Sequence, residues 1–429
     1  MSSEPILGLD FGTTNTVVAL ANGAGAAAVV RVPVAGREVA AFRSVLAFAE
    51  PERRGGPPGV EAGPAAVELF ADDPAGTRLI QSFKTFAASR VFRDTDIWGR
   101  RWRFEDLLFA LLNQLRTYAG DRLLPLPTRA VIGRPVVFAG ADPDPALAEA
   151  RYREALGRFG FTDLSFVYEP VGAAWFWARG LERDATVLVA DFGGGTSDFS
   201  VVRFERRAGR LGAEPLGNAG VGVAGDAFDY RLIDNVVSPR LGKGGDYRSD
   251  GKILPVPNRY YAAFARWNQL ALLKHTRDMR EIRSLAKVAL QPEKVGAFVE
   301  LLDDDHGWRL YQAVTAAKEQ LSAADTAMFD FHAGSVAIRS EVRRADFERW
   351  ISPELTGIAG ALDLALERAN TPASAVDKVF LTGGSSFVPA VRRLFTDRFG
   401  AERIESGGEF ESIATGLALL GAAEPALTA

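Results

Sequence analysis

One short glycine-rich phrase occurs twice in this chain, first as DFGTTNT over Asp10–Thr16 and again as DFGGGTSD over Asp191–Asp198. Each copy follows an apolar run, Ile6–Leu9 in the first and Val187–Ala190 in the second. Such a run predicts a buried strand that ends on a carboxylate. Because the copies lie almost half the chain apart, the simplest architecture is a pair of similar lobes that face one nucleotide.

Both phrases carry groups that hold a phosphate. Glycine lets the backbone approach a ligand closely and tolerates positive φ, and successive backbone N–H groups in such a turn form an anion-binding concavity. The groups in question are Gly12, Thr13, Thr14 and Asn15 in the first turn, and Gly193, Gly194, Gly195 and Thr196 in the second. Asp10 and Asp191 would repel a phosphate unless a cation lay between, and Mg²⁺ held largely through water fits that role. Each motif alone also fits a plain glycine turn between hairpin strands, and the repetition favours the nucleotide.

Composition narrows the class of protein. The 429 residues are 47% hydrophobic and 24% charged, which indicates a soluble globular protein of more than one lobe. A formal net charge of −4, without a basic arm, argues against nucleic-acid binding. With no cysteine and three scattered histidines, a structural zinc site is close to excluded. The lack of cysteine and the acidic N-terminal segment favour the cytoplasm. The uncharged stretch Phe11–Val30 is too rich in threonine and glycine to span a membrane, and Asn22-Gly23 predicts a hairpin there.

Strands and helices alternate in each half of the chain, which predicts α/β layers with covered sheets. In the first half we expect a meander over 6–34, a Pro/Gly-rich loop over 51–64, a helix over 107–118, a strand over 130–138 and a helix over 146–157. In the second half we expect strands over 185–204, a mostly helical section over 239–327, a helix over 355–366 and a strand over 379–382. The predicted lobes are residues 1–184 and 185–429, and the helical section forms a subdomain of the second.

A third motif, Gly383-Gly384-Ser385-Ser386, lies between the last of these strands and a helix whose first turn contains Pro389. Its glycines would let the backbone approach a flat ring or a phosphate, and Ser385 or Ser386 could cap the helix. A plain strand-to-helix connection explains this motif slightly better when it is taken alone.

The order of the motifs resembles the ATPase domain of the seventy-kilodalton heat-shock, or DnaK-like, chaperones, which belongs to the actin-like ATPase superfamily. The motifs are DFGTTNT, VYEPVGAAW, VLVADFGGGTSDFSVV, AGDAFD and VFLTGGSSFVP, and together they extend over essentially the whole chain. The resemblance implies duplicated ribonuclease-H-like domains around a central nucleotide cleft. It is greatest with the YegD-like branch, which implies that a peptide-binding domain is lacking.

The resemblance also implies roles for individual residues. In the family, a lysine from the first lobe reaches the γ-phosphate and its attacking water, and a glutamate polarises metal-bound water. Lys84 and Glu169 match these two residues. The residues that match the metal-organising carboxylates are Asp10, Asp191 and Asp198, and those that match the phosphate-contacting hydroxyls are Thr13 and Thr196. Without the family, Lys84 would be interpreted as a solvated surface charge and Glu169 as an acid that ends a strand.

The nucleotide-binding set implied by the resemblance continues beyond the second phrase. Its further members are Gly225 and Asp226 near the phosphates, Lys318 and Ser322 on a helix that stacks against the adenosine, and Gly383, Gly384 and Ser385. A helix with a solvated lysine is the alternative for Lys318. Three positions depart from the family, which usually has a glycine, a basic residue and an adenine-stacking arginine where this chain has Ala224, Glu319 and Phe387.

The implied function is a nucleotide-driven conformational switch with slow hydrolysis of ATP to ADP, read by a protein partner or client of unknown identity. The cofactors are ATP or ADP with Mg²⁺, and K⁺ as an optional further cation. The residues implied in catalysis are Lys84, Glu169, Asp191, Asp10 and Thr196, with Asp191 or Glu169 as the base. Two alternatives stay open: an actin-like filament-forming ATPase and, with less support, a sugar kinase of the same superfamily, for which no local phrase supplies a catalytic carboxylate.

Overall fold

The computed structural model describes residues 5–22, 26–34, 36–53, 55–140, 142–207, 210–266, 277–304, 306–407 and 411–423. It divides into two compact units, one formed by Met1–Ala224 with Thr356–Ala429 and the other by Gly225–Leu355. In sequence, the second unit is therefore an insertion into the first. The predicted turn at Gly23 lies outside the described residues, and the lobe boundary between residues 184 and 185 stays a prediction.

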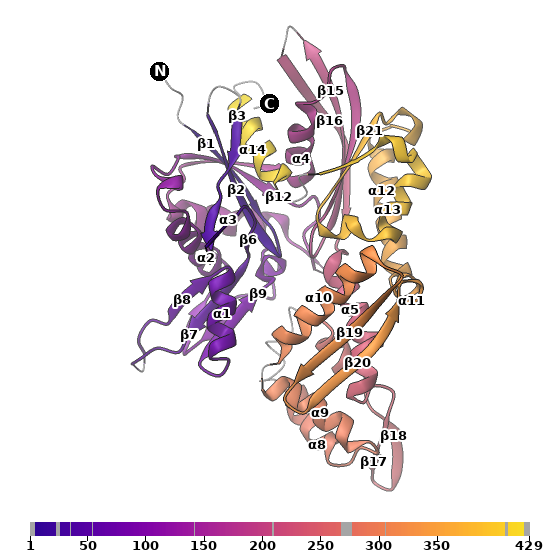
Figure 1. Ribbon diagram of the computed structural model, residues 1–429. Helices are drawn as coiled ribbons and strands as arrows, with labels where there is room; N and C mark the ends of the chain where they lie inside the picture. Colours follow the sequence, from indigo (N-terminus) through magenta and orange to yellow (C-terminus); the bar gives the residue numbers. More distant parts are fainter. Residues whose placement is uncertain are drawn as a thin grey trace. The chain divides into compact units, whose positions relative to one another are not determined.

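Two sheets with the same topology form the larger unit (Figure 1). The first has the order β3-β2-β1-β12-β13 and the second has the order β16-β15-β14-β21-β22. In each sheet, three antiparallel strands that follow one another in the chain are joined by two parallel strands that come later. The repeated phrase is thus one part of a repeated topology. The strands are β1 (Ile6–Phe11), β2 (Asn15–Asn22), β3 (Ala26–Val29), β12 (Arg129–Arg134) and β13 (Asp163–Tyr168), and then β14 (Ala185–Phe192), β15 (Ser197–Arg207), β16 (Arg210–Val221), β21 (Lys378–Thr382) and β22 (Ile404–Ser406).

The short strand β6 (Phe42–Arg43) pairs with β2 at the edge of the first sheet, and a smaller sheet and two hairpins complete the strands described in this unit. The small sheet pairs β7 (Val45–Ala49) with β8 (Gly59–Ala62) and β9 (Thr77–Gln81), and helix α1 (Pro64–Asp72) packs on it. The loop predicted over 51–64 therefore contains a strand, because Val60 pairs with Phe48 and Ala62 pairs with Leu46. The other short strands are β4 (Val32–Val34), β5 (Arg37–Val39), β10 (Thr95–Ile97) and β11 (Arg100–Trp102).

Helices α2 (Phe104–Ala119) and α3 (Pro145–Phe159) pack against each other, and their apolar faces share a core with the strands of the first sheet. Leu7, Leu9 and Phe11 of β1 lie in this core, as the period of two in a strand requires. Both helices confirm the sequence prediction. The start of α3 is fixed by Asp144, whose carboxylate accepts a hydrogen bond from the Leu147 N–H at 3.1 Å.

Helices α4 (Glu169–Ala178) and α14 (Ser412–Ala423) each pack mainly on the sheet that they do not follow in the chain. Helix α4 follows the last strand of the first sheet but packs on β14 and β15, whereas α14 follows the second sheet but packs on β1, β2, β3 and β12 (Figure 1). The helices cross at two glycines, where a Cβ added to Gly416 would lie 1.7 Å from the Gly172 carbonyl oxygen. Helix α14 also approaches β1 closely, since a Cβ on Gly8 would lie 2.2 Å from the Ala414 carbonyl oxygen.

The second sheet also packs against α13 (Pro389–Phe399). The ring of Phe395 meets Phe192 and Phe199 at centroid distances of 5.8 Å and 6.3 Å. The predicted helix over 355–366 is confirmed as part of α12 (Ser352–Arg368). The prediction that Ser385 or Ser386 caps α13 is wrong: Gly384–Phe387 is a 3₁₀ turn, Val388 is the cap residue, and Ser386 Oγ donates to the Gly383 carbonyl at 2.6 Å.

The inserted unit contains helices and two hairpins around its own core, in which the rings of Tyr261 and Phe298 stack at 5.0 Å. The described part of 239–327 is largely helical and also includes the hairpin of β17 (Asp246–Ser249) and β18 (Lys252–Pro255). The remaining elements are α5 (Gly225–Leu232), α6 (Asn258–Phe264), α8 (Arg277–Ala286), α9 (Pro292–Asp303), α10 (Gly307–Ala323), β19 (Thr326–Ala333), β20 (Val336–Arg343) and α11 (Arg344–Trp350).

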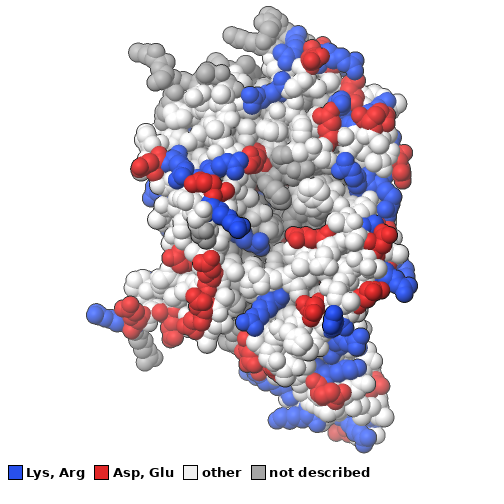
Figure 2. Space-filling model, viewed as in Figure 1, with Lys and Arg blue, Asp and Glu red and all other residues white. Residues whose placement is uncertain are grey.

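The surface carries mixed charge. On the face shown in Figure 2, lysine and arginine side chains are interspersed with aspartate and glutamate. Among the helices of the described ranges, none combines the length and the apolar character needed to cross a lipid bilayer.

Candidate functional site

The two repeated phrases form equivalent hairpin turns. In the first, the Gly12 N–H donates to the Asn15 carbonyl at 2.9 Å, and in the second the Gly193 N–H donates to the Thr196 carbonyl at 3.0 Å. A Cβ on Gly12 would lie 2.4 Å from the Asn15 carbonyl oxygen, so this turn requires glycine because of close backbone approach. Gly12, Gly193 and Gly195 are not among the glycines with positive φ, so at Gly12 the need for glycine comes from the close backbone approach alone.

The structure brings the two turns together. A Cβ on Gly195 would lie 3.8 Å from Thr13 Oγ1, although the two residues belong to different sheets. By the alternation of strand residues, Asp10 shares the face of Gly8, which contacts α14, and Asp191 shares the face of Val189, which packs with α4. The charge of Asp10 acts on Asp191 and helps to raise the pKa of Asp191. The two strand-ending carboxylates thus lie close together, as two lobes facing one nucleotide require.

Lys84 and Glu169 form a buried ion pair in this unit. Lys84 Nζ donates to Glu169 Oε1 at 2.7 Å, and the side chains are only 9% and 5% exposed. Lys84 lies in the 3₁₀ turn Phe83–Phe86, and Glu169 is the first residue of α4. Burial by itself would lower the pKa of Lys84, but Glu169 and other negative neighbours raise it above its ordinary value. Lys84 is therefore not the solvated surface lysine that its local sequence would also have allowed.

The carboxylates around this pair have perturbed acidities. Burial and the nearby Glu169 charge raise the pKa of Asp10 from 3.8 to about 7. The same causes raise the pKa of Asp198 to about 7 and that of Asp191 well above its usual range. Buried carboxyl groups with raised pKa values that lie close together are typical of functional sites. The cluster can change its charge near neutral pH and would be stabilised in its ionised form by a cation.

Asp198 connects the two sheets. Its Oδ1 accepts a hydrogen bond from the Val137 N–H at 3.1 Å, and Val137 follows β12 of the first sheet. Its Oδ2 is buried, and a hydrogen bond from the Thr196 side chain to this carboxylate partly offsets the effect of burial on its pKa. An acceptor of this kind fits a cation or its water shell. The oxygens of Asp10, Asp191 and Asp198 do not gather within 4.8 Å of one another, so these residues suit a hydrated Mg²⁺ better than a closed protein cage.

The third motif meets the end of β14. Gly383 has φ of 82°, and a Cβ there would lie 2.0 Å from the Phe192 carbonyl oxygen. The glycine therefore allows the turn after β21 to contact the residue next to Asp191. Ser385 is buried, Gly384 begins the 3₁₀ turn, and Phe387, where the family usually has an arginine, is 49% exposed.

The predicted residues of the inserted unit have partners within that unit. Lys318 Nζ lies 2.7 Å from Asp229 Oδ1, with side chains 18% and 2% exposed, so Lys318 is not a solvated lysine. Burial, followed by the Asp229 charge, raises the pKa of Asp226 to about 6. Gly225 begins α5, and Ser322 Oγ donates to the Lys318 carbonyl at 3.1 Å within α10. Whether these residues bind nucleotide stays a prediction.

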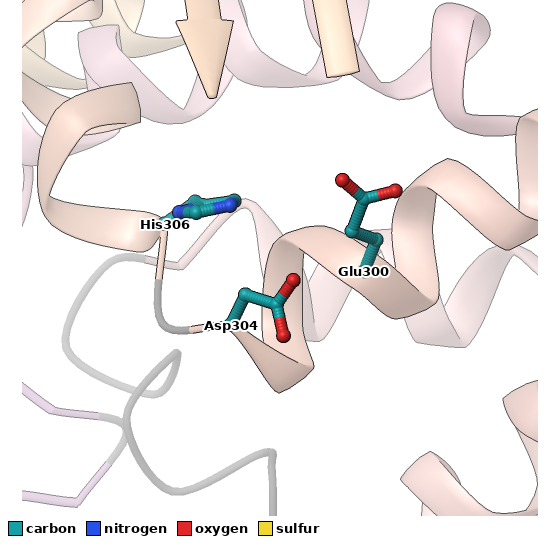
Figure 3. Close-up of side chains that lie close together, drawn as sticks. All are labelled: Glu300, Asp304 and His306. Carbon is teal, nitrogen blue, oxygen red and sulfur yellow. The ribbon is translucent and has the colours of Figure 1, made fainter. Parts of the chain in front are cut away.

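Another group of metal-type ligands lies in the inserted unit. Glu300, Asp304 and His306 have ligand atoms within 4.8 Å of one another (Figure 3). However, the Glu300 carboxylate accepts hydrogen bonds from the Ser335 N–H at 2.6 Å and from the Ser335 hydroxyl, which lower the pKa of Glu300. Glu300 thus holds the turn between β19 and β20, where Gly334 has φ of 57°. This structural role accounts for Glu300, and we leave the group out of the site.

The sequence analysis missed Tyr152, which lies near the ion pair, and Arg134, whose charge acts on the Tyr152 hydroxyl. Tyr152 on α3 is buried among aromatic rings, and its hydroxyl lies within electrostatic reach of Lys84 and Glu169. The Arg134 guanidinium, at the end of β12, lies 5.1 Å from the Tyr168 ring centroid and 5.4 Å from that of Phe138. An aromatic residue at helical spacing is typical of a core, so no local signal distinguished Tyr152.

Comparison with known proteins shows similarity to one family. Residues 294–425 match the family model described as Hsp70 protein. The chain is 24% identical over 438 aligned residues to a chaperone protein DnaK of Halobacterium salinarum. The chain is similar to Hsp70 proteins. The DnaK alignment covers 98% of this chain and 56% of the relative, so the chain spans about half the length of that relative. The predicted two-lobed actin-like fold is confirmed.

Proposed function

We propose that this chain binds ATP with Mg²⁺ and hydrolyses it slowly, as a chaperone-related conformational switch. The observation that carries the proposal is the buried Lys84–Glu169 pair beside Asp10 and Asp191, at the ends of two equivalent glycine turns. Similarity to a protein named as a chaperone supports the switch. Membership of a YegD-like branch and a cytoplasmic location stay predictions of the sequence.

The residues of the site suit phosphoryl transfer to water. The backbone N–H groups of the two turns would bind phosphate oxygens, and the Lys84 ammonium would offset the negative charge on the γ-phosphate. We assign the base to Asp191 rather than Glu169. Glu169 already accepts a hydrogen bond from Lys84, so the Asp191 carboxylate near the end of β14 is the acceptor that the ion pair does not occupy. Asp10 and Asp198 would hold a hydrated Mg²⁺, which would neutralise charge on the phosphates.

The test compares Lys84→Ala with Lys378→Ala. Lys378 is a matched control because it is a half-exposed lysine paired with Glu405 in the same unit. Calorimetry with ATP and Mg²⁺ should show binding to the wild type and to both variants. Single-turnover hydrolysis should fall about a hundredfold or more in Lys84→Ala and stay unchanged in Lys378→Ala, because a group that offsets developing charge contributes about 3 kcal/mol.

Absence of both ATP binding and turnover in the wild type would refute the proposal. Two other outcomes would favour the alternatives. Light scattering that rises with ATP at micromolar protein would indicate a filament, and ADP release stimulated by a sugar would indicate a kinase.

A further inference from the structure

The hydroxyl of Tyr152 is a buried polar group without an evident structural reason. Tyr152 is 1% exposed, and its ring lies 5.7 Å to 6.3 Å, between centroids, from the rings of Phe11, Phe104, Phe138 and Phe166. Its Oη is buried and has no hydrogen-bond partner among the residues that the structure describes. Burying an unsatisfied hydroxyl costs stability, and phenylalanine would fill the same space without that cost.

Tyr152 and Lys84 both lie beside the ring of Phe11. The Phe11 ring has Tyr152 at a centroid distance of 6.1 Å and the Lys84 Nζ at 6.0 Å. The charges that act on the Tyr152 hydroxyl are, in decreasing order, those of Lys84, Glu169, Arg134 and Asp10. Burial raises the pKa of Tyr152 above its ordinary value, so the phenol is neutral and offers one donor and one acceptor near this cluster.

The Lys84 ammonium has three N–H donors, and the structure shows one of them bonded to Glu169. A flexible lysine that must serve both a carboxylate and a phosphate needs a further contact to fix its head group. Glu169 accepts only one of the three N–H groups, so a second contact is needed to fix the orientation of the ammonium.

We propose that Tyr152 is a positioning residue whose hydroxyl accepts a hydrogen bond from Lys84 when the ammonium turns toward the γ-phosphate. The proposal rests on the proposed ATPase function. It explains why an uncompensated hydroxyl is retained in an aromatic core, since the group has its partner in the reacting complex. The orientation of Lys84 then depends on α3 as well as on α4.

Tyr152→Phe removes the hydroxyl and keeps the ring. We expect kcat for ATP hydrolysis to fall about tenfold, while the Kd for ADP with Mg²⁺, measured by calorimetry, changes less than twofold. The thermal midpoint should rise slightly, because the unsatisfied hydroxyl is gone. A purely structural tyrosine would lose stability and activity together. The matched control is Tyr118→Phe, which removes a hydroxyl bonded to Glu61 at 3.0 Å, remote from these charges, and should leave kcat unchanged.

A double-mutant cycle tests whether the Tyr152 hydroxyl acts through Lys84 or independently of it. In a Lys84→Ala background, Tyr152→Phe should cause no further loss of kcat, because the hydroxyl acts through the ammonium. An undiminished kcat in Tyr152→Phe, or an equal loss with and without Lys84, would overturn the positioning role while leaving the ATPase function intact. A wild type that neither binds nor hydrolyses ATP would overturn the proposed function, and the positioning role with it.

Discussion

Replacing Asp198 by asparagine should change how the stability of the ligand-free protein depends on pH. Asp198 is fully buried, and its pKa is raised from 3.8 to about 7, first by burial and then by the Glu169 charge. Because the folded-state pKa is raised, the folded protein holds a proton that the unfolded chain releases. The stabilisation from that proton is complete below pH 3.8 and is lost as the pH rises to about 7. Asparagine resembles the protonated acid and has no such dependence.

The size of the effect follows from the shift. Each pH unit between the two pKa values corresponds to about 1.4 kcal/mol. Between pH 5 and pH 7.5 the wild type should lose about 2.5 kcal/mol more than Asp198→Asn. Any fixed cost of asparagine is the same at both pH values and cancels. For a unit of about 300 residues this corresponds to a shift of about 4 °C in the difference between melting temperatures.

The assay is thermal unfolding of both proteins, without nucleotide or Mg²⁺, at pH 5 and pH 7.5. Asp144→Asn is the control. Its N-cap hydrogen bond lowers the pKa of Asp144, so that residue is ionised at both pH values and its variant should show a constant difference. Parallel curves for wild type and Asp198→Asn would refute the reasoning, because they would mean that Asp198 ionises normally in the folded protein.

Further predictions concern the packing of two helix glycines and one buried ion pair. Gly416→Ala should lower the free energy of unfolding by about 2 kcal/mol or more, because its Cβ would lie 1.7 Å from the Gly172 oxygen; Gly360→Ala, in an exposed part of α12 with nothing within 4 Å, should raise it by about 0.5–1 kcal/mol in the same urea titration. Asp229→Asn should destabilise the inserted unit by about 2 kcal/mol, because Lys318 then loses its buried partner. Faster hydrogen exchange in α5 and α10 would show this, and unchanged exchange would contradict it.

The sequence predicted the parts of the fold that depend on local pattern. The repeated strand and turn, the stripe of leucines in α2 and the Asp144 cap each occur within a few neighbouring residues, and the structure has all of them. The strand β8 was missed because proline and glycine dominate its surroundings, while its pairing with β7 depends on residues elsewhere in the chain.

The site was only partly predictable for the same reason. Asp10 and Asp191 are marked by their place at the ends of apolar runs, but Lys84 and Glu169 could be assigned only by resemblance, because no local pattern shows that they pair. Gly133 gave no signal at all. A Cβ on Gly133 would lie 3.0 Å from Glu169 Cγ, and this crowding arises only when β12 and α4 are both in place.

The packing of α4 and α14 on each other's sheets has a consequence for dividing this chain into fragments. Gly8, Val17, Ala19 and Ala21 in the first half are covered by α14 from the other end of the sequence, and β14 and β15 in the second half are covered by α4 from the first. A cut between the two repeats would strip an apolar face from each fragment. The two halves have the same sheet topology, but each supplies the helix that covers the sheet of the other. Neither half is therefore expected to fold stably by itself.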